Sequence, residues 1–109
     1  MVNVSEYIDE RGKSPYAEWH DQLDARAAAK VSTALYRLEQ GNFSNTSGVR
    51  GGVFEYKINF GPGYRIYFGK DGERVVIILG GGTKRRQQQG INAAKASWQD
   101  YKARKRKSK

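Results

Sequence analysis

The feature that most constrains the fold is an alternation of apolar and polar residues between residues 53 and 68. In the stretch VFEYKINFGPGYRIYF, apolar side chains occupy every second position on both sides of a Gly-Pro-Gly turn at 61–63. Such an alternation is typical of half-buried strands, and a turn between two of them predicts an antiparallel hairpin. The next apolar run, RVVIIL at 74–79, has no polar face, which predicts a strand covered on both sides.

Two helices are predicted before the hairpin. Ser14 followed by Pro15 is typical of a helix start, and apolar side chains at helical spacing predict a helix over residues 15–23. Asp24 is placed to cap a second helix over residues 25–40. Because almost no chain separates them, we expect the two helices to form a hairpin.

The remaining segments complete a single domain. Residues 3–8 are a candidate edge strand, the polar and glycine-rich segment 41–52 predicts a loop, and a last amphipathic helix is expected from Ile91. We predict one α+β domain over residues 1–101, with the helical hairpin and the C-terminal helix packed on one face of a small antiparallel sheet. Residues 102–109 are expected to be a disordered basic tail.

Composition limits the function classes. Six of the net +9 charges come from the tail, so the rest of the chain carries only +3, and the position of the cations matters more than their sum. The absence of cysteine excludes disulfides and thiolate metal sites, and we predict no cofactor and no metal. No apolar run approaches the ~20 residues of a membrane span, which favours a cytoplasmic protein without membrane association.

The hairpin register predicts a basic patch. If the turn has three residues, Asn59 lies opposite Arg65. By the same register, Lys57 lies opposite Tyr67. Opposed residues share one face of a sheet, so these four side chains are predicted to form a compact patch that faces outward or into a cleft.

A second group of cations is predicted to lie beside this patch. The last strand runs antiparallel to the second, so its end, followed by Lys84, Arg85 and Arg86, reaches the turn near Arg65. A concave basic edge of this kind suits a phosphate backbone. The same residues also have a purely structural interpretation, because strand cations are often solvated and glycines after a strand turn the chain.

The motifs GVFEYKINFGPGYRIYF, VVIILGGGTK followed by glutamine, and INAAKASWQDY resemble the addiction-module killer proteins, HigB-like members of the RelE/ParE toxin superfamily. The resemblance covers about residues 7–101 and implies that superfamily's compact α+β fold. It implies the toxin of a type II toxin–antitoxin system, and many members of this kind are ribosome-dependent endoribonucleases that cut mRNA. The alternative is a non-catalytic binding toxin, such as a ParE-like DNA gyrase inhibitor, or a basic nucleic-acid-binding module.

The resemblance also implies partners. They are a cognate antitoxin, a helix-turn-helix protein encoded by the adjacent gene that masks the basic surface, and the ribosome with its mRNA. Operator DNA would be bound only through the antitoxin.

The resemblance matches the family's cations to Arg65, Lys57, Lys84 and either Arg85 or Arg86. We predict catalytic roles for Arg65, Lys57 and Arg85. Phosphate or RNA contacts are predicted for Lys84 and Arg86, and for Asn59 and Tyr67 of the hairpin patch. Arg65 suits the scissile phosphate, and Lys57 is a candidate base. Tyr67 is a candidate acid for the leaving group. Asn59 stands where ribonuclease members often have a second lysine, and residues 87–91 lack the tyrosine or histidine that such members carry. An Arg65→Ala variant is expected to relieve growth arrest with the fold preserved.

Overall fold

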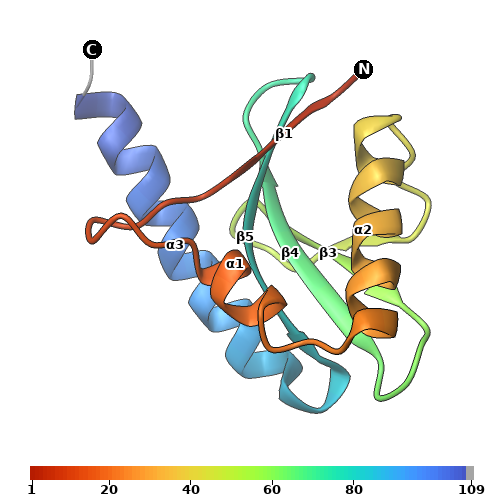
Figure 1. The fold of residues 1–109 in the computed structure, drawn as a ribbon. Helices are drawn as coiled ribbons and strands as arrows, with labels where there is room; N and C mark the ends of the chain where they lie inside the picture. The colour runs from red at the N-terminus through yellow and green to blue at the C-terminus, as the bar shows by residue number, and fades with distance from the viewer. Residues whose placement is uncertain (108–109) are drawn as a thin grey trace.

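Five strands form one mixed sheet that has helices on both of its faces (Figure 1). The computed structural model describes residues 1–107. Along the chain, the elements are β1 (Asn3–Glu6), α1 (Pro15–His20), α2 (Ala25–Glu39), β2 (Thr46–Gly48), β3 (Val53–Ile58), β4 (Tyr64–Lys70), β5 (Val75–Thr83), the 3₁₀ turn η1 (Lys84–Arg86) and α3 (Gln87–Lys107). The strand order is β1-β5-β4-β3-β2, in which β1 is parallel to β5 and the other neighbours are antiparallel. The chain is therefore a single-domain α+β protein, but its sheet is mixed, not antiparallel as predicted.

Both predicted helix starts are confirmed. The Ser14 hydroxyl accepts a hydrogen bond from the Ala17 N–H at 3.0 Å, and Pro15 occupies the first turn. The Asp24 carboxylate accepts a hydrogen bond from the Ala27 N–H at 2.8 Å. Each cap satisfies an N–H group that the first helical turn leaves free, which stabilises the helix by about 1 kcal/mol.

The interior strand β5 is buried from both sides, as its apolar sequence predicted. Val76 and Ile78 belong to the core that α1 and α2 cover, whereas Ile77 and Leu79 belong to the core beneath α3. All four residues are at most 4% exposed. Successive side chains of a strand point to opposite faces, so an apolar strand of this kind requires cover on both.

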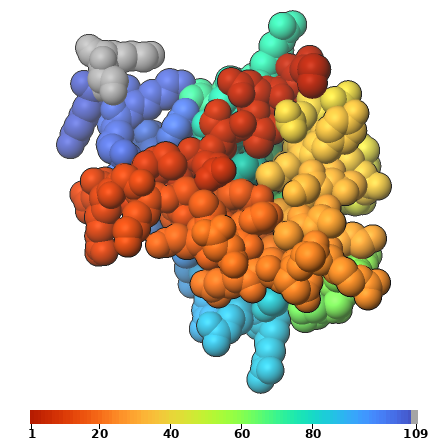
Figure 2. Space-filling view, viewed as in Figure 1, coloured from red at the N-terminus to blue at the C-terminus, as the bar shows by residue number. Residues whose placement is uncertain are grey.

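The position of α3 corrects the prediction that all helices cover one face. Ile91, Ala94 and Trp98 of α3 pack with Tyr67 and with β5 on the face opposite α1 and α2. Figure 2 shows the N-terminal segment, α1 and α2 covering the side turned toward the viewer, with the blue end of α3 emerging beyond them. The physical reason is that the second face has an apolar core of its own, which only α3 can bury.

The β3–β4 register differs by two residues from the prediction. Tyr64 pairs with Ile58, not with Phe60, because the loop between the strands has five residues. Phe60 leaves the sheet for α2, where Arg26 and Lys30 place their cations 5.7 and 5.3 Å from the centre of its ring. A shift of two residues leaves every side chain on its predicted face but changes its partner.

Two segments that were expected to be irregular are ordered. The predicted loop 41–52 contains β2, which pairs with β3. The last helix begins at Gln87, not near Ile91, and continues to Lys107, so residues 102–107 of the expected disordered tail are helical. The last two residues of that tail lie outside the described part of the chain. No helix within residues 1–107 is both long and apolar enough to cross a membrane.

Specific partners hold the last turns of α3. The Tyr101 hydroxyl donates a hydrogen bond to the Asp71 carboxylate at 2.6 Å, and the Lys105 ammonium donates to the same group at 2.6 Å. The Arg104 guanidinium donates to the carbonyl oxygen of Ile8 at 2.5 Å. The partners of these residues lie far from the tail in the sequence, which is why the local composition of the tail did not predict the contacts.

Two glycines allow aromatic rings to lie directly on the sheet. A Cβ atom on Gly81 would lie 2.2 Å from the Trp19 ring of α1, and one on Gly69 would lie 2.6 Å from the Trp98 ring of α3. Contacts this short cannot be accommodated without displacing a ring. These glycines therefore set how closely α1 and α3 approach the two faces of the sheet.

We predict that Gly81→Ala lowers the free energy of unfolding by about 1–3 kcal/mol, because the methyl group overpacks the contact with Trp19. Gly80→Ala is the matched control, since a Cβ atom at this neighbouring position of β5 meets no atom within 4 Å. Urea denaturation of both variants measures the difference. Equal stabilities for the two variants would contradict the proposed role of the Trp19 contact.

Candidate functional site

The observed register gathers polar side chains on the face of the sheet that α3 covers. Lys57 lies opposite Arg65, and Glu55 lies opposite Tyr67. Opposed residues in a sheet have Cβ atoms about 5 Å apart and share a face. Lys57, Arg65 and Tyr67 therefore share a face, as predicted. The partner of Arg65 is Lys57, however, and Asn59 lies outside the paired part of the strand.

Glu55 is the centre of a buried polar network. The side-chain amide of Gln87 donates to both of its carboxylate oxygens at 2.9 Å. The Arg65 Nε atom lies 3.8 Å from one oxygen, and the Lys57 Nζ atom lies 4.0 Å from the other. Glu55 is only 2% exposed, and the burial of a carboxyl group this deep in a protein is costly without such partners.

Arg65 is buried, which corrects the prediction that it faces outward or into a cleft. Its side chain is only 7% exposed, because α3 covers this face of the sheet. One terminal nitrogen donates to the Tyr64 carbonyl oxygen at 3.4 Å. Its Nε atom has no hydrogen-bond partner within residues 1–107, so the guanidinium retains donor capacity beside Glu55.

Tyr67 is sealed between the sheet and α3. Its hydroxyl donates to the Gln87 carbonyl oxygen at 3.3 Å, and Gly90 lies so close that a Cβ atom there would be 2.6 Å from the ring. Burial raises the pKa of Tyr67 to about 12, and the charge of Glu55 contributes to the rise while that of Arg65 opposes it. Tyr67 is 1% exposed, so its placement does not suit the predicted roles of RNA contact and leaving-group acid.

The predicted approach of Lys84 to the hairpin turn is present. The Lys84 N–H donates to the Gly63 carbonyl oxygen at 2.8 Å. A Cβ atom on Gly63 would lie 3.2 Å from the Cβ of Lys84 and 3.9 Å from a terminal nitrogen of Arg65, so both side chains border this residue. Arg85 and Arg86 follow in η1, are exposed, and line a hollow of about 370 Å³ with Gln88 and Gln89 of α3.

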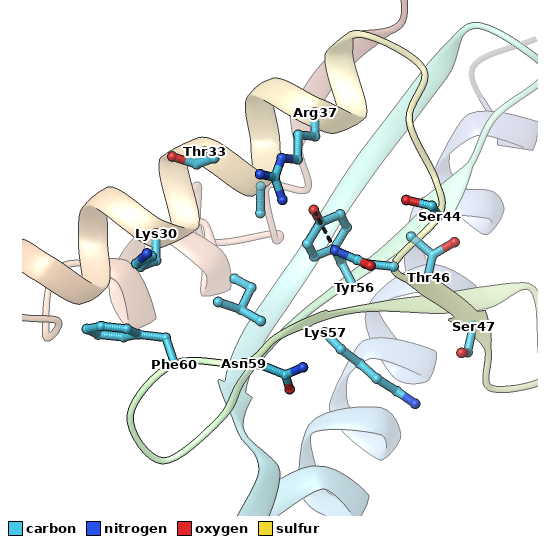
Figure 3. A pocket seen from close by; sticks show the side chains of 13 residues that line it. Lys30, Thr33, Arg37, Ser44, Thr46, Ser47, Tyr56, Lys57, Asn59 and Phe60 are labelled. Atoms are coloured by element: carbon cyan, nitrogen blue, oxygen red, sulfur yellow. Dashed lines mark hydrogen bonds between the residues drawn. The ribbon is translucent and has the colours of Figure 1, made fainter.

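Lys57 and Asn59 line a groove of about 520 Å³ between α2 and the β2–β3 edge of the sheet. Lys30 and Arg37 of α2 line its opposite side (Figure 3). The Lys57 side chain is 47% exposed, so it is the accessible cation of the Glu55 network. The structure thus divides the predicted site residues among the groove, the buried network and the exposed turn η1.

Two residues of the network were not predicted as site residues. Glu55 stands on the polar face of the strand alternation, and it is the only carboxylate there. Gln87 is the first of three consecutive glutamines and carried no signal that distinguished it from its neighbours. The alternation could have pointed to Glu55, whereas the contact of Gln87 depends on where α3 begins. Within residues 1–107, no group of three or more His, Cys, Asp or Glu side chains is arranged to hold a metal ion.

Comparison with known proteins supplies one relative of use. No protein-family model matches the chain. A protein of Haemophilus influenzae (strain ATCC 51907 / DSM 11121 / KW20 / Rd), described as uncharacterized, is 37% identical over 81 residues. The match covers 73% of this chain and 82% of the relative. The chain therefore belongs to the same family as this uncharacterized Haemophilus protein.

We predict that Arg65→Met lowers the free energy of unfolding by about 3–5 kcal/mol, because it leaves the Glu55 carboxylate buried without its closest cation. Adding Glu55→Gln to the variant removes the buried charge and should recover part of the loss. A double-mutant cycle by urea denaturation measures the coupling between the two residues, and strict additivity would contradict it.

Proposed function

We propose that the chain is the toxin of a type II toxin–antitoxin system that cuts mRNA on the ribosome. One observation supports this most strongly: Lys57 and Arg65 meet at Glu55, and Lys84 borders Arg65 at the same end of the sheet. Cationic side chains that converge from neighbouring strands suit an RNA phosphate, because the negative charge on the phosphate increases as the phosphodiester is cleaved.

In the proposed mechanism, exposed and buried cations have different roles. Lys57 and Lys84 are accessible and would contact the phosphate directly. Arg65 is buried and would not touch the phosphate. Its guanidinium, whose Nε–H makes no hydrogen bond, would add to the positive electrostatic potential, and Glu55 would hold both strand cations in place. Arg85 and Arg86, exposed in η1, would bind the flanking backbone.

The proposed site offers few groups for proton transfer. Tyr67 and Glu55 are too deeply buried to exchange protons with an RNA chain. The proposal therefore assigns catalysis chiefly to charge stabilisation. The ribosome would supply the bent, in-line geometry in which the 2′-hydroxyl attacks its own phosphate as the bond between phosphorus and the 5′-oxygen breaks. Water would take the proton of the 2′-hydroxyl and would supply one to the leaving 5′-oxygen. A dependence on the ribosome follows from this division.

The proposed partners follow from the same surface. A cognate antitoxin, a helix-turn-helix protein encoded by the adjacent gene, would cover the basic groups and bring the toxin to operator DNA. The site of action would be the cytoplasm, where translating ribosomes present mRNA.

The burial of Arg65 favours a second candidate from another class. The Arg65 side chain is only 7% exposed, so a structural role as the partner of Glu55 explains it as well as a catalytic role does. A non-catalytic binding protein, such as a gyrase inhibitor or a basic nucleic-acid-binding module, would need only the exposed cations.

Expression in growing cells tests the proposal. We expect the wild-type chain to arrest growth and to produce transcript ends within coding frames, mapped by primer extension. Lys57→Gln should reduce cleavage at least about tenfold, because it removes the accessible phosphate contact and leaves the buried pair intact. Lys13→Gln, which removes an exposed cation far from the site, should cut like the wild type.

Three other results would contradict the ribonuclease proposal. Unchanged cleavage by Lys57→Gln would place the active site elsewhere. A DNA-damage response without transcript cleavage would indicate gyrase as the target. Normal growth in the absence of any antitoxin would indicate a plain binding module.

A further inference from the structure

The charged side chains that line the groove between α2 and the β2–β3 edge are all positive. Lys30, Arg37 and Lys57 line it, and no aspartate or glutamate does. Within residues 1–107, neither Lys30 nor Arg37 has a carboxylate within 4 Å. Two cations without acidic partners that point into one groove create a positive potential that attracts an anion.

The cations stand on both sides of the groove. Lys30, Thr33 and Arg37 are separated by three and four residues, so they form one stripe along α2, with the Cα atoms of the two basic residues about 10 Å apart along the axis. Figure 3 shows this stripe on one side, with Asn59 and Lys57 on the other. An anionic chain lying in the groove would therefore meet donors from the helix and from the sheet.

We infer that this groove binds the sugar–phosphate backbone of a single-stranded RNA and leads it to Lys57. That this RNA is also the substrate rests on the proposed function. The link is Lys57, which belongs both to the groove and to the Glu55 network. A volume of about 520 Å³ is that of a small-molecule site, which holds about one or two nucleotides and not the face of a duplex.

An acidic peptide fits the groove less well. Addition of a peptide strand to β3 is blocked, since β2 already pairs with residues 54–56 and the Lys57 N–H donates to the Asn45 carbonyl oxygen at 3.0 Å. A helical peptide would need several apolar anchor sites. The groove lining instead consists mainly of hydroxyl, amide and cationic side chains, which suit sugar and phosphate oxygens.

Phe60 closes one end of the groove with a face suited to nucleotides. Its ring is partly exposed, and Arg26 and Lys30 hold cations 5.7 and 5.3 Å from its centre. Aromatic side chains next to cations are a common combination in proteins that bind single-stranded nucleic acids.

Fluorescence anisotropy with the full chain tests the inference. The probe is a labelled 12-nucleotide RNA with 2′-O-methyl groups throughout, which cannot be cleaved through its 2′-hydroxyls. We expect Lys30→Gln/Arg37→Gln to raise Kd about tenfold and to reduce the slope of log K against log salt by about 1.4, the value for two lost contacts to a single strand. Arg11→Gln/Lys13→Gln removes the same charge from a distant loop and should leave Kd and slope near those of the wild type.

Each other outcome overturns the inference. Equal losses in the two double variants would show that net charge, not the groove, governs binding. Tighter binding of a base-paired RNA hairpin would exclude a single-strand site. Binding of a 12-residue polyglutamate peptide that depends on Lys30 and Arg37, while RNA binding does not, would assign the groove to an acidic peptide.

The experiments distinguish a failure of the proposed ribonuclease function from a failure of the groove inference. If transcripts are not cut in cells but RNA binding still requires Lys30 and Arg37, the groove is an RNA site of a non-catalytic protein. If Lys57→Gln abolishes cleavage and the groove variant binds RNA like the wild type, the catalytic proposal stands and the groove inference fails. Thermal unfolding of each variant checks that these exposed substitutions leave the fold intact.

Discussion

The structure depends on the two apolar faces of β5. A strand that carries Val76 and Ile78 on one side and Ile77 and Leu79 on the other cannot leave either side to water. The helical hairpin covers one side, and the C-terminal helix must cover the other. This requirement places β5 inside the sheet, between β4 and its parallel neighbour β1, and sets the path of α3.

Covering the second face has a consequence for the site. The helix that buries Ile77 and Leu79 also covers Glu55, Arg65 and Tyr67, which share their face. The charge of Arg65 then needs an acidic partner, which Glu55 provides, and Glu55 needs Gln87 to satisfy its oxygens. The polar network is therefore also part of the packing between the sheet and α3.

The sequence was sufficient for features that depend on neighbouring residues. The caps Ser14 and Asp24, the two faces of the hairpin and the double burial of β5 all follow from local pattern. The register did not, because Phe60 leaves the strand to pack beneath cations of α2, which are distant in the sequence. Gln87 could not be assigned for the same reason, since its contact with Glu55 exists only once α3 is placed.

The helical tail shows why net charge is a poor guide to the binding surface. Most of the excess positive charge lies at residues 102–109, yet within this segment Lys105 is engaged with Asp71, and Arg104 contacts Asp100 and the Ile8 carbonyl oxygen. Such contacts attach the end of α3 to the domain and weaken the field it offers to a ligand. Cations in the groove and in η1 lack carboxylate partners within residues 1–107, with the exception of Lys57. The charge of the tail is therefore partly neutralised by the domain itself, and the net charge of the chain does not locate a binding surface.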